Sequence, residues 1–289
     1  MTKETKGMLI GFIGVAIFSL TLPLTRIVVQ EITPFYVSFG RGVIAGVCGA
    51  ILLLLSKSPL PTKTQFKKLL ITAFGVVYGF PIFTSLAMQT LPSAHSGIVL
   101  GILPLATSAM GAIRFRERPS FAYWVTAVCG TLLVLVYSMM DAGGLALGDI
   151  WLLLAIVTVS MSYSEGGKLA QEMGAIKVIS WAMAMTLPIN IPAAFLFANT
   201  ALTDLSANAF IAFLYLGLFS AFIGFFFWYR GIALGGVARV GQVQLLQPFL
   251  TLIGAYFLLG EPITVLNTVF AIAVLVVVLI GRRTSIEAK

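Results

Sequence analysis

The stretch PLATSAMGAIRFRE at residues 104–117 has a counterpart, PFLTLIGAYFLLGE, at residues 248–261. Five pairs of identical residues in and before these stretches coincide at a shift of 144 residues. The pairs are Ala94 and Ala238, Gly97 and Gly241, Pro104 and Pro248, Thr107 and Thr251, and Glu117 and Glu261. This recurrence predicts an internal duplication, with residues 1–141 as the first copy and residues 142–289 as the second.

Apolar segments separated by short breaks fill almost the whole chain. Its 289 residues are 59% hydrophobic and 10% charged, with a mean hydropathy of +1.04, whereas a soluble domain is about 25% charged. A helix that crosses a bilayer needs roughly 20 apolar residues, and these runs are too long and too uniformly apolar for barrel strands. The predicted fold class is therefore an all-α integral membrane protein with ten transmembrane helices. We place the helices at 7–30, 34–56, 67–89, 94–113, 119–140, 148–169, 176–198, 206–229, 238–259 and 263–281.

Positive charge is confined to alternate loops. The N-terminus, every second loop and the C-terminus hold sixteen of the eighteen Lys and Arg residues. The opposite loops carry Glu31, Asp141, Asp149, Asp204 and Glu261. Positive loops stay in the cytoplasm, so both termini are predicted to be cytoplasmic. Because each copy holds five helices, the second copy enters the membrane from the other side, which makes an inverted repeat able to open a central site alternately to each side.

One short motif occurs in both copies, as Pro104 with Glu117-Arg118 and as Pro248 with Gly260-Glu261. Two further features are Arg41 in the first copy and Gly148-Asp149 at the start of the segment 148–169 in the second. Over essentially the full chain the order of these features resembles the paired signature of the drug/metabolite transporter superfamily, and most closely its EamA family. The resemblance implies ten helices in two inverted halves around a central cavity, in proteins that commonly export amino acids and other small metabolites.

Two further stretches bear on that resemblance. Tyr163–Lys168 is similar to the corresponding stretch of the aromatic amino-acid exporter subgroup. The segment 7–30 departs from the family pattern, because Ala16–Ser19 stands where a Trp-Gly pair is common.

Ionisable residues inside the predicted spans are candidate pathway residues, because a charge near the bilayer centre costs about 2.5–3.5 kcal/mol and usually faces a cavity or a partner. Glu165 could bind a substrate ammonium or a proton, or pair with Lys168 three residues on. His95, the one histidine of the chain, could titrate at the external mouth of the pathway or lie in headgroup water. Arg41 could attract a substrate carboxylate, snorkel outward or pair with Glu31.

The segment 238–259 is unusually polar around its proline. Gln244 and Gln247 recur at helical spacing near Pro248, and an amide can both donate and accept hydrogen bonds. Pro248 and Pro104 are predicted to kink their helices, since a proline removes a backbone hydrogen bond. The glutamines are therefore candidates for substrate contacts, or alternatively for hydrogen bonds between helices.

Tyr78 and Tyr163 complete the candidate substrate-binding residues, because a buried tyrosine hydroxyl needs a partner. No phosphate loop or clustered metal-ligand set is present, so the chain is predicted not to be an enzyme and to use no cofactor or metal. The net charge of +8 is attributed to the loop signals that orient the spans, with no nucleic-acid partner.

The sequence thus predicts a secondary transporter of the bacterial inner (plasma) membrane that exports small metabolites by alternating access. Amino acids, including aromatic ones, are the leading substrate class. The alternatives are efflux of lipophilic cations with Glu165 as the counter-charge, uptake of metabolites by the same fold, and a channel or scaffold. The expected partners are a small-molecule substrate and the lipid bilayer, and a monomer is compatible with this reading.

Overall fold

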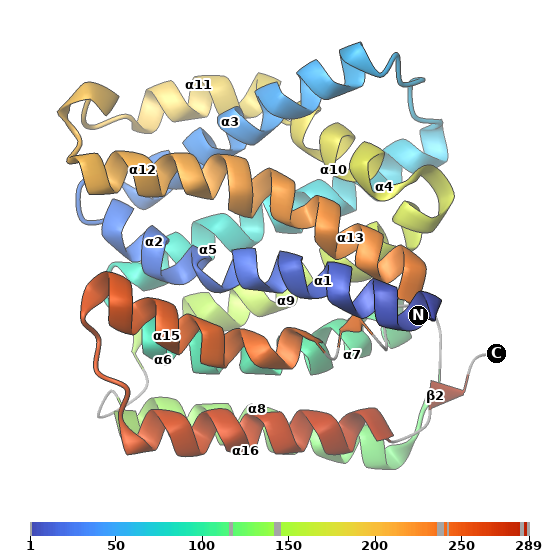
Figure 1. Ribbon diagram of the computed structural model, residues 1–289, viewed down its shortest axis with the longest axis vertical. Coiled ribbons are helices and arrows are strands. Elements are labelled where there is room, and N and C mark those ends of the chain that lie inside the picture. Colours follow the sequence, from blue (N-terminus) through green and yellow to red (C-terminus); the bar gives the residue numbers. More distant parts are fainter. Residues whose placement is uncertain are drawn as a thin grey trace.

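The computed structural model describes residues 2–115, 118–141, 146–235, 240–241, 243–283 and 286–287. Within these ranges the chain is helical, apart from loops and one pair of two-residue strands, β1 (Arg118–Pro119) and β2 (Ile286–Glu287), which pair antiparallel. Figure 1 shows the helices lying side by side, with the start of the first helix and β2 at one end of the bundle. We call that end the terminal end, and the other the far end.

Helices lie at each of the ten predicted segments. In the first half they are α1 (Lys3–Ser19), α2 (Thr21–Val28), α3 (Pro34–Leu55), α4 (Lys63–Ala73), η1 (Phe74–Gly79), α5 (Phe80–Met88), α6 (Ser93–Val99), η2 (Leu100–Ile102), α7 (Leu103–Phe115) and α8 (Phe121–Asp141). In the second half they are α9 (Leu147–Met173), α10 (Ala175–Ala184), α11 (Leu187–Phe197), η3 (Leu202–Asp204), α12 (Ala207–Tyr215), η4 (Leu216–Ile223), α13 (Gly224–Gly235), η5 (Val243–Leu246), α15 (Gln247–Leu259) and α16 (Val265–Arg283). Glu117 and Ala238 of the sequence repeat lie outside the described residues.

The described helices include seven that are long and apolar enough to cross a membrane. The pair α10 and α11, bent by 51° at its break, makes an eighth if it is counted as one span. Two apolar helices are shorter, at Val243–Leu259 and Val265–Ile280. The all-helical membrane fold is thus confirmed, whereas the full set of ten spans stays a prediction.

The two halves interrupt their helices at corresponding places. The third span of each half contains a π-helical segment, η1 in the first and η4 in the second. The fourth span of each half contains a 3₁₀ turn, η2 or η5, which is followed directly by a helix with Pro104 or Pro248 at its second residue. A proline is tolerated there because the first turn leaves its N–H unbonded anyway. Each proline therefore marks the point where the span changes helix type.

Packing partners are also exchanged between the halves. The first span packs against the eighth (α1 on α13), and the sixth packs against the third (α9 on α5). The remaining spans pair with their own counterparts: α3 with α10 and α11, α6 with α15, and α8 with α16. A two-fold axis in the membrane plane would produce this pattern.

Small residues allow close contacts between helices of the two halves. A Cβ on Gly97 would lie 2.7 Å from the Thr251 side chain, and one on Gly101 would lie 3.1 Å from Pro248. The absence of a side chain at both glycines therefore lets α15 pack closely against this span. Large apolar side chains face outward, as expected for a surface that meets lipid. Among the most exposed are Leu54, Phe121, Phe195, Leu196, Phe257 and Val265.

Candidate functional site

A small closed cavity lies at the centre of the bundle. Its lining comes from both halves, and its polar members are Thr21, Arg41, Tyr163, Ser220 and Gln247. Aromatic rings of Phe18, Phe80 and Phe225 form much of the remaining wall. The cavity volume is about 10 Å³, roughly the space that one water molecule needs. As described, the cavity therefore has no room for a molecule larger than water.

Arg41 projects from α3 into this cavity and is 3% exposed. Its Nη2 donates a hydrogen bond to the Ser220 hydroxyl at 2.9 Å, and that hydroxyl lies 2.8 Å from the hydroxyl of Thr21. Nε and Nη1 of Arg41 have no hydrogen-bond partner among the described residues. Glu31 instead accepts hydrogen bonds from Ser206. The alternative in which Arg41 snorkels outward or pairs with Glu31 is therefore wrong.

The predicted tyrosines and glutamines divide between the cavity and its surroundings. Tyr163 and Gln247 line the cavity, and Oε1 of Gln247 lacks a partner among the described residues. Gln244, in η5, is 3% exposed with an unpartnered Nε2, but it does not line the cavity. Tyr78, in η1, also lies outside the lining, and its ring centroid is 6.1 Å from that of Phe39.

Glu165 lies nearer the terminal end of α9 and does not line the cavity. Its carboxylate is buried, and Oε2 accepts a hydrogen bond at 2.9 Å from Nε of Arg114 on α7. The guanidinium side chain of Arg114 is 46% exposed and borders a groove of about 320 Å³ that Lys63, Lys67 and Lys68 also line. The partner of Glu165 is thus Arg114, from another span, and the predicted pairing with Lys168 is wrong.

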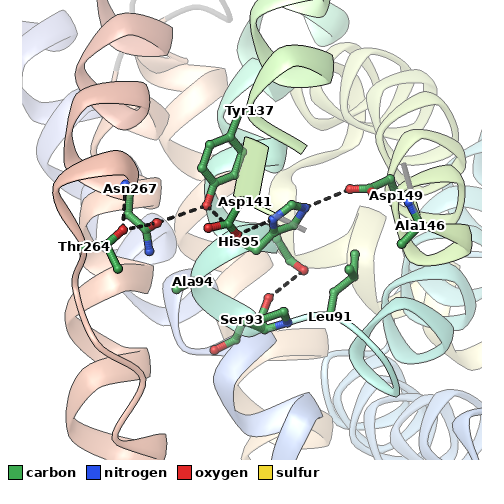
Figure 2. A network of polar contacts seen from close by, with 12 residues as sticks. Leu91, Ser93, Ala94, His95, Tyr137, Asp141, Ala146, Asp149, Thr264 and Asn267 are labelled. Carbon is green, nitrogen blue, oxygen red and sulfur yellow. Dashed lines mark hydrogen bonds and ion pairs between the residues drawn. The ribbon is translucent and has the colours of Figure 1, made fainter. Parts of the chain in front are cut away.

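His95 lies toward the far end, near the start of α6, and its side chain is 0% exposed. Figure 2 shows the imidazole between two carboxylates. Nδ1 is 2.7 Å from Oδ2 of Asp141 on α8, and Nε2 is 2.8 Å from Oδ1 of Asp149 on α9. The alternative that places His95 in headgroup water is therefore wrong, because α8 and α9 cover the ring.

Sequence reasoning treated Asp141 and Asp149 as charges of the external loops, and Asp149 also as part of the Gly148-Asp149 motif, but it did not connect either residue with His95. A usable signal was present, since both residues border spans on the same side as the only histidine. Tyr137, one helical turn before Asp141, was missed as well. Its ring stacks on His95 with centroids 5.0 Å apart, and its hydroxyl lies 3.3 Å from Asp141 Oδ2.

The Gly-Glu motif after α15 has a clear structural role. Gly260 ends the helix with φ of +66°, a left-handed conformation that glycine adopts without strain. The chain then turns so that Glu261 accepts hydrogen bonds from the backbone N–H groups of Ser93 and Ala94, at 2.9 and 2.7 Å. Nε of Arg26 lies 3.4 Å from the same carboxylate. The second half therefore caps α6 of the first half.

A bundle of apolar helices with a small buried cavity, to whose lining both halves contribute polar residues, is typical of membrane carriers. Comparison with known proteins agrees, since the model of the EamA-like transporter family matches this chain twice, over residues 5–139 and 146–281. The chain belongs to the EamA-like transporter family. It is a multi-pass membrane transporter and not an enzyme.

Individual relatives extend over the whole chain. An uncharacterized transporter of Bacillus subtilis (strain 168), YdeK, is 43% identical over 284 residues, which are 98% of this chain and 99% of that protein. An uncharacterized transporter of Archaeoglobus fulgidus is 23% identical over 262 residues, covering 90% and 92% of the two chains. A protein of known crystal structure, 19% identical in sequence, has the same fold with a TM-score of 0.69. The match covers 96% of this chain and 96% of that protein.

Proposed function

We propose that this transporter exports small metabolites that carry a carboxylate, foremost amino acids including aromatic ones, across the bacterial inner (plasma) membrane. The proposed mechanism is alternating access, in which the two halves move around the central cavity. The exchanged packing partners of the halves support it, as do the paired interruptions η1 with η4 and η2 with η5.

The observation that carries this proposal is the guanidinium of Arg41. It is buried beside a closed cavity, and two of its three nitrogens lack partners among the described residues. A buried charge without a counter-charge is costly, whereas a guanidinium and a carboxylate can form two parallel hydrogen bonds. A substrate carboxylate in the cavity would therefore supply what Arg41 lacks.

The other lining residues suit the rest of an amino acid. Oε1 of Gln247 is an unpartnered acceptor in the same lining, which would accept a hydrogen bond from a substrate ammonium. Phe18, Phe80, Phe225 and Tyr163 offer ring surfaces, against which an aromatic side chain would pack in offset or edge-to-face contacts.

The same residues disfavour efflux of lipophilic cations. The charge that faces the cavity is the positive charge of Arg41, which repels a cation. Glu165, the counter-charge that such a function would need, lies outside the cavity lining and is paired with Arg114.

Counterflow in proteoliposomes with a panel of labelled amino acids tests the proposal. Arg41→Gln removes the charge, and we expect exchange to fall roughly 10- to 100-fold, since a hydrogen bond to a charged group contributes about 1.5–3 kcal/mol. Arg230→Gln, at an exposed arginine of α13, is the matched control and should exchange normally. Arg41→Lys keeps the charge but not the paired geometry, and should give an intermediate rate.

If the folded Arg41→Gln variant showed saturable exchange at the same rate as the unsubstituted protein, the role assigned to Arg41 would be refuted. Absence of exchange for every amino acid by the unsubstituted, folded protein would refute the substrate class. Efflux from cells loaded with an accepted amino acid distinguishes export from uptake, because net export predicts faster loss from cells that express the transporter.

A further inference from the structure

The buried imidazole of His95 joins the two halves of the chain. Asp141 belongs to the first half and Asp149 to the second, and each carboxylate faces one ring nitrogen. The side chains of His95 and Asp149 are 0% and 3% exposed, whereas that of Asp141 is 23% exposed. The cluster is therefore closed toward α9 and reachable from the far end through Asp141.

Both short contacts can be hydrogen bonds only if the cluster holds two protons. An imidazolium supplies one N–H to each carboxylate. A neutral imidazole supplies one N–H, so the second contact then needs a protonated carboxyl group. With a single proton, one nitrogen lone pair would face a carboxylate oxygen, and that contact would be repulsive. Loss of one proton therefore breaks either the contact with α8 or the contact with α9.

The surroundings favour a charged ring. Tyr137 stacks on His95 at 5.0 Å between centroids, a geometry that stabilises a cation over an aromatic face. The hydroxyl of Tyr137 lies 3.3 Å from Asp141 Oδ2 and 3.4 Å from Asn267 Oδ1 on α16. Asp149 also accepts a hydrogen bond at 2.9 Å from the backbone N–H of Ala146, which holds its carboxylate in place.

Other ionisable groups near the start of α6 are already paired. Glu261, from the loop after α15, accepts hydrogen bonds from Ser93 and Ala94. Arg26 of α2 lies 3.4 Å from Glu261, and its Nη1 donates to the carbonyl of Met88. The titratable groups that face His95 are thus Asp141, Tyr137 and Asp149, with the Glu261–Arg26 pair beyond them.

We propose that His95, Asp141 and Asp149 form a proton-binding site, and that its proton controls whether the central cavity opens toward the far end. The bound proton keeps α6 and α9 in contact. Its release leaves one N–H on the ring. With that N–H on Nδ1, bonded to Asp141, the lone pair of Nε2 faces Asp149, and the far ends of α6 and α9 can move apart. The second part of this proposal rests on the proposed transport function, whereas the first part does not.

The link to the cavity is spatial. Asp149 is carried by α9, which also supplies Val159 and Tyr163 to the cavity lining. His95 is carried by the span that continues through η2 to Leu103, another lining residue. The cluster therefore joins, at the far end, two spans whose middle parts enclose the cavity.

The single histidine makes the proton directly observable. Labelling with ¹⁵N-histidine places all imidazole signals on His95, so a pH titration of the protein in lipid nanodiscs by NMR reports this site alone. At acidic pH both nitrogens should give signals of protonated nitrogens. As the pH rises, one nitrogen should lose its proton in a single step.

Variants identify the partners of the imidazole. Asp149→Asn and Asp141→Asn each remove one carboxylate, and each should shift the loss of the second proton to lower pH. Asp204→Asn, at an exposed carboxylate of the same end, is the matched control and should leave the titration unchanged. If Asp141→Asn and Asp149→Asn both gave the same titration curve as the unsubstituted protein, the proposed proton-binding site would be overturned.

The opening is measured separately. Spin labels are placed at Pro92→Cys, an exposed residue directly before α6, and at Leu147→Cys, an exposed residue at the start of α9. They are introduced after Cys48 and Cys129 have been replaced by Ser. Pulsed EPR should show a longer-distance population that grows as the pH rises through the NMR midpoint. His95→Gln should remove that pH dependence. Distances that stay constant through the midpoint would overturn control of the opening while leaving the proton site intact.

Discussion

The two ends of α9 are held by chemically different contacts. Toward the far end, Asp149 contacts His95 of α6, and toward the terminal end, Glu165 contacts Arg114 of α7. Both contacts join the fourth span to the sixth, and the cavity lies between them. A guanidinium keeps its proton at any physiological pH, whereas an imidazole does not. The contact at the far end can therefore depend on pH. The contact at the terminal end instead weakens when water or another charged group binds Arg114 or Glu165.

The largest expected effect breaks the far-end contact. Asp149→Ala leaves a buried imidazole with one carboxylate and removes the hydrogen bond to the Ala146 N–H at the start of α9. Removing one partner of a buried ionic contact costs about 3–5 kcal/mol. Thermal unfolding in detergent should show this loss of stability, and Asp204→Ala should unfold almost as the unsubstituted protein does. If Asp149→Ala and Asp204→Ala unfolded at the same temperature, the idea that the far-end contact stabilises the protein would be contradicted.

A smaller effect is expected at the terminal end. Glu165→Gln removes the charge of the buried partner, but the half-exposed Arg114 can turn to water, so the cost should be about 1–2 kcal/mol. Thermal unfolding in detergent at neutral pH should show this smaller loss of stability. A loss as large as that of Asp149→Ala would contradict the idea that Arg114 turns to water when its partner is removed.

The smallest effect concerns a loop at the far end. Hydrogen bonds from the hydroxyl and backbone N–H of Ser206 hold the pKa of Glu31 below its usual 4.5. A lowered carboxyl pKa adds stability that is present above the unfolded value and is lost as pH falls through the folded value. Glu31→Gln should therefore unfold with a weaker dependence on pH below about 4.5. An unchanged acid dependence would show that Ser206 does not stabilise the ionised form.

These two far-end dependences have opposite signs, which separates them experimentally. Stability from Glu31 declines toward acid, whereas the proposed proton site predicts that the contacts of His95 weaken toward alkaline pH. A profile measured on the double variant Glu31→Gln with His95→Gln should be flatter on both sides than that of the unsubstituted protein.

Much of the fold could be predicted from the sequence, because bilayer thickness dictates helix length and prolines and glycines mark the breaks. The candidate site was harder, because position along a span does not tell which way a side chain faces. Arg41 lies on the side of α3 that meets the cavity, and no periodicity in so apolar a helix distinguishes that side.

Partners from distant spans were the second difficulty. Neighbour rules within a helix suggested Lys168 for Glu165, but Arg114 is 51 residues away in the chain. His95 lies near a predicted loop, which suggested water, yet α8 and α9 cover it. The cluster with Asp141 and Asp149 depends on how three spans are arranged in space, and a hydropathy pattern contains no such information.

The cap that Glu261 forms on Ser93 and Ala94 has an evolutionary consequence. A gene for the first half alone would encode an α6 whose N–H groups at Ser93 and Ala94 lack this carboxylate. The two halves are therefore not free to change independently where they meet, because a substitution at Glu261 in one half alters the start of a helix in the other.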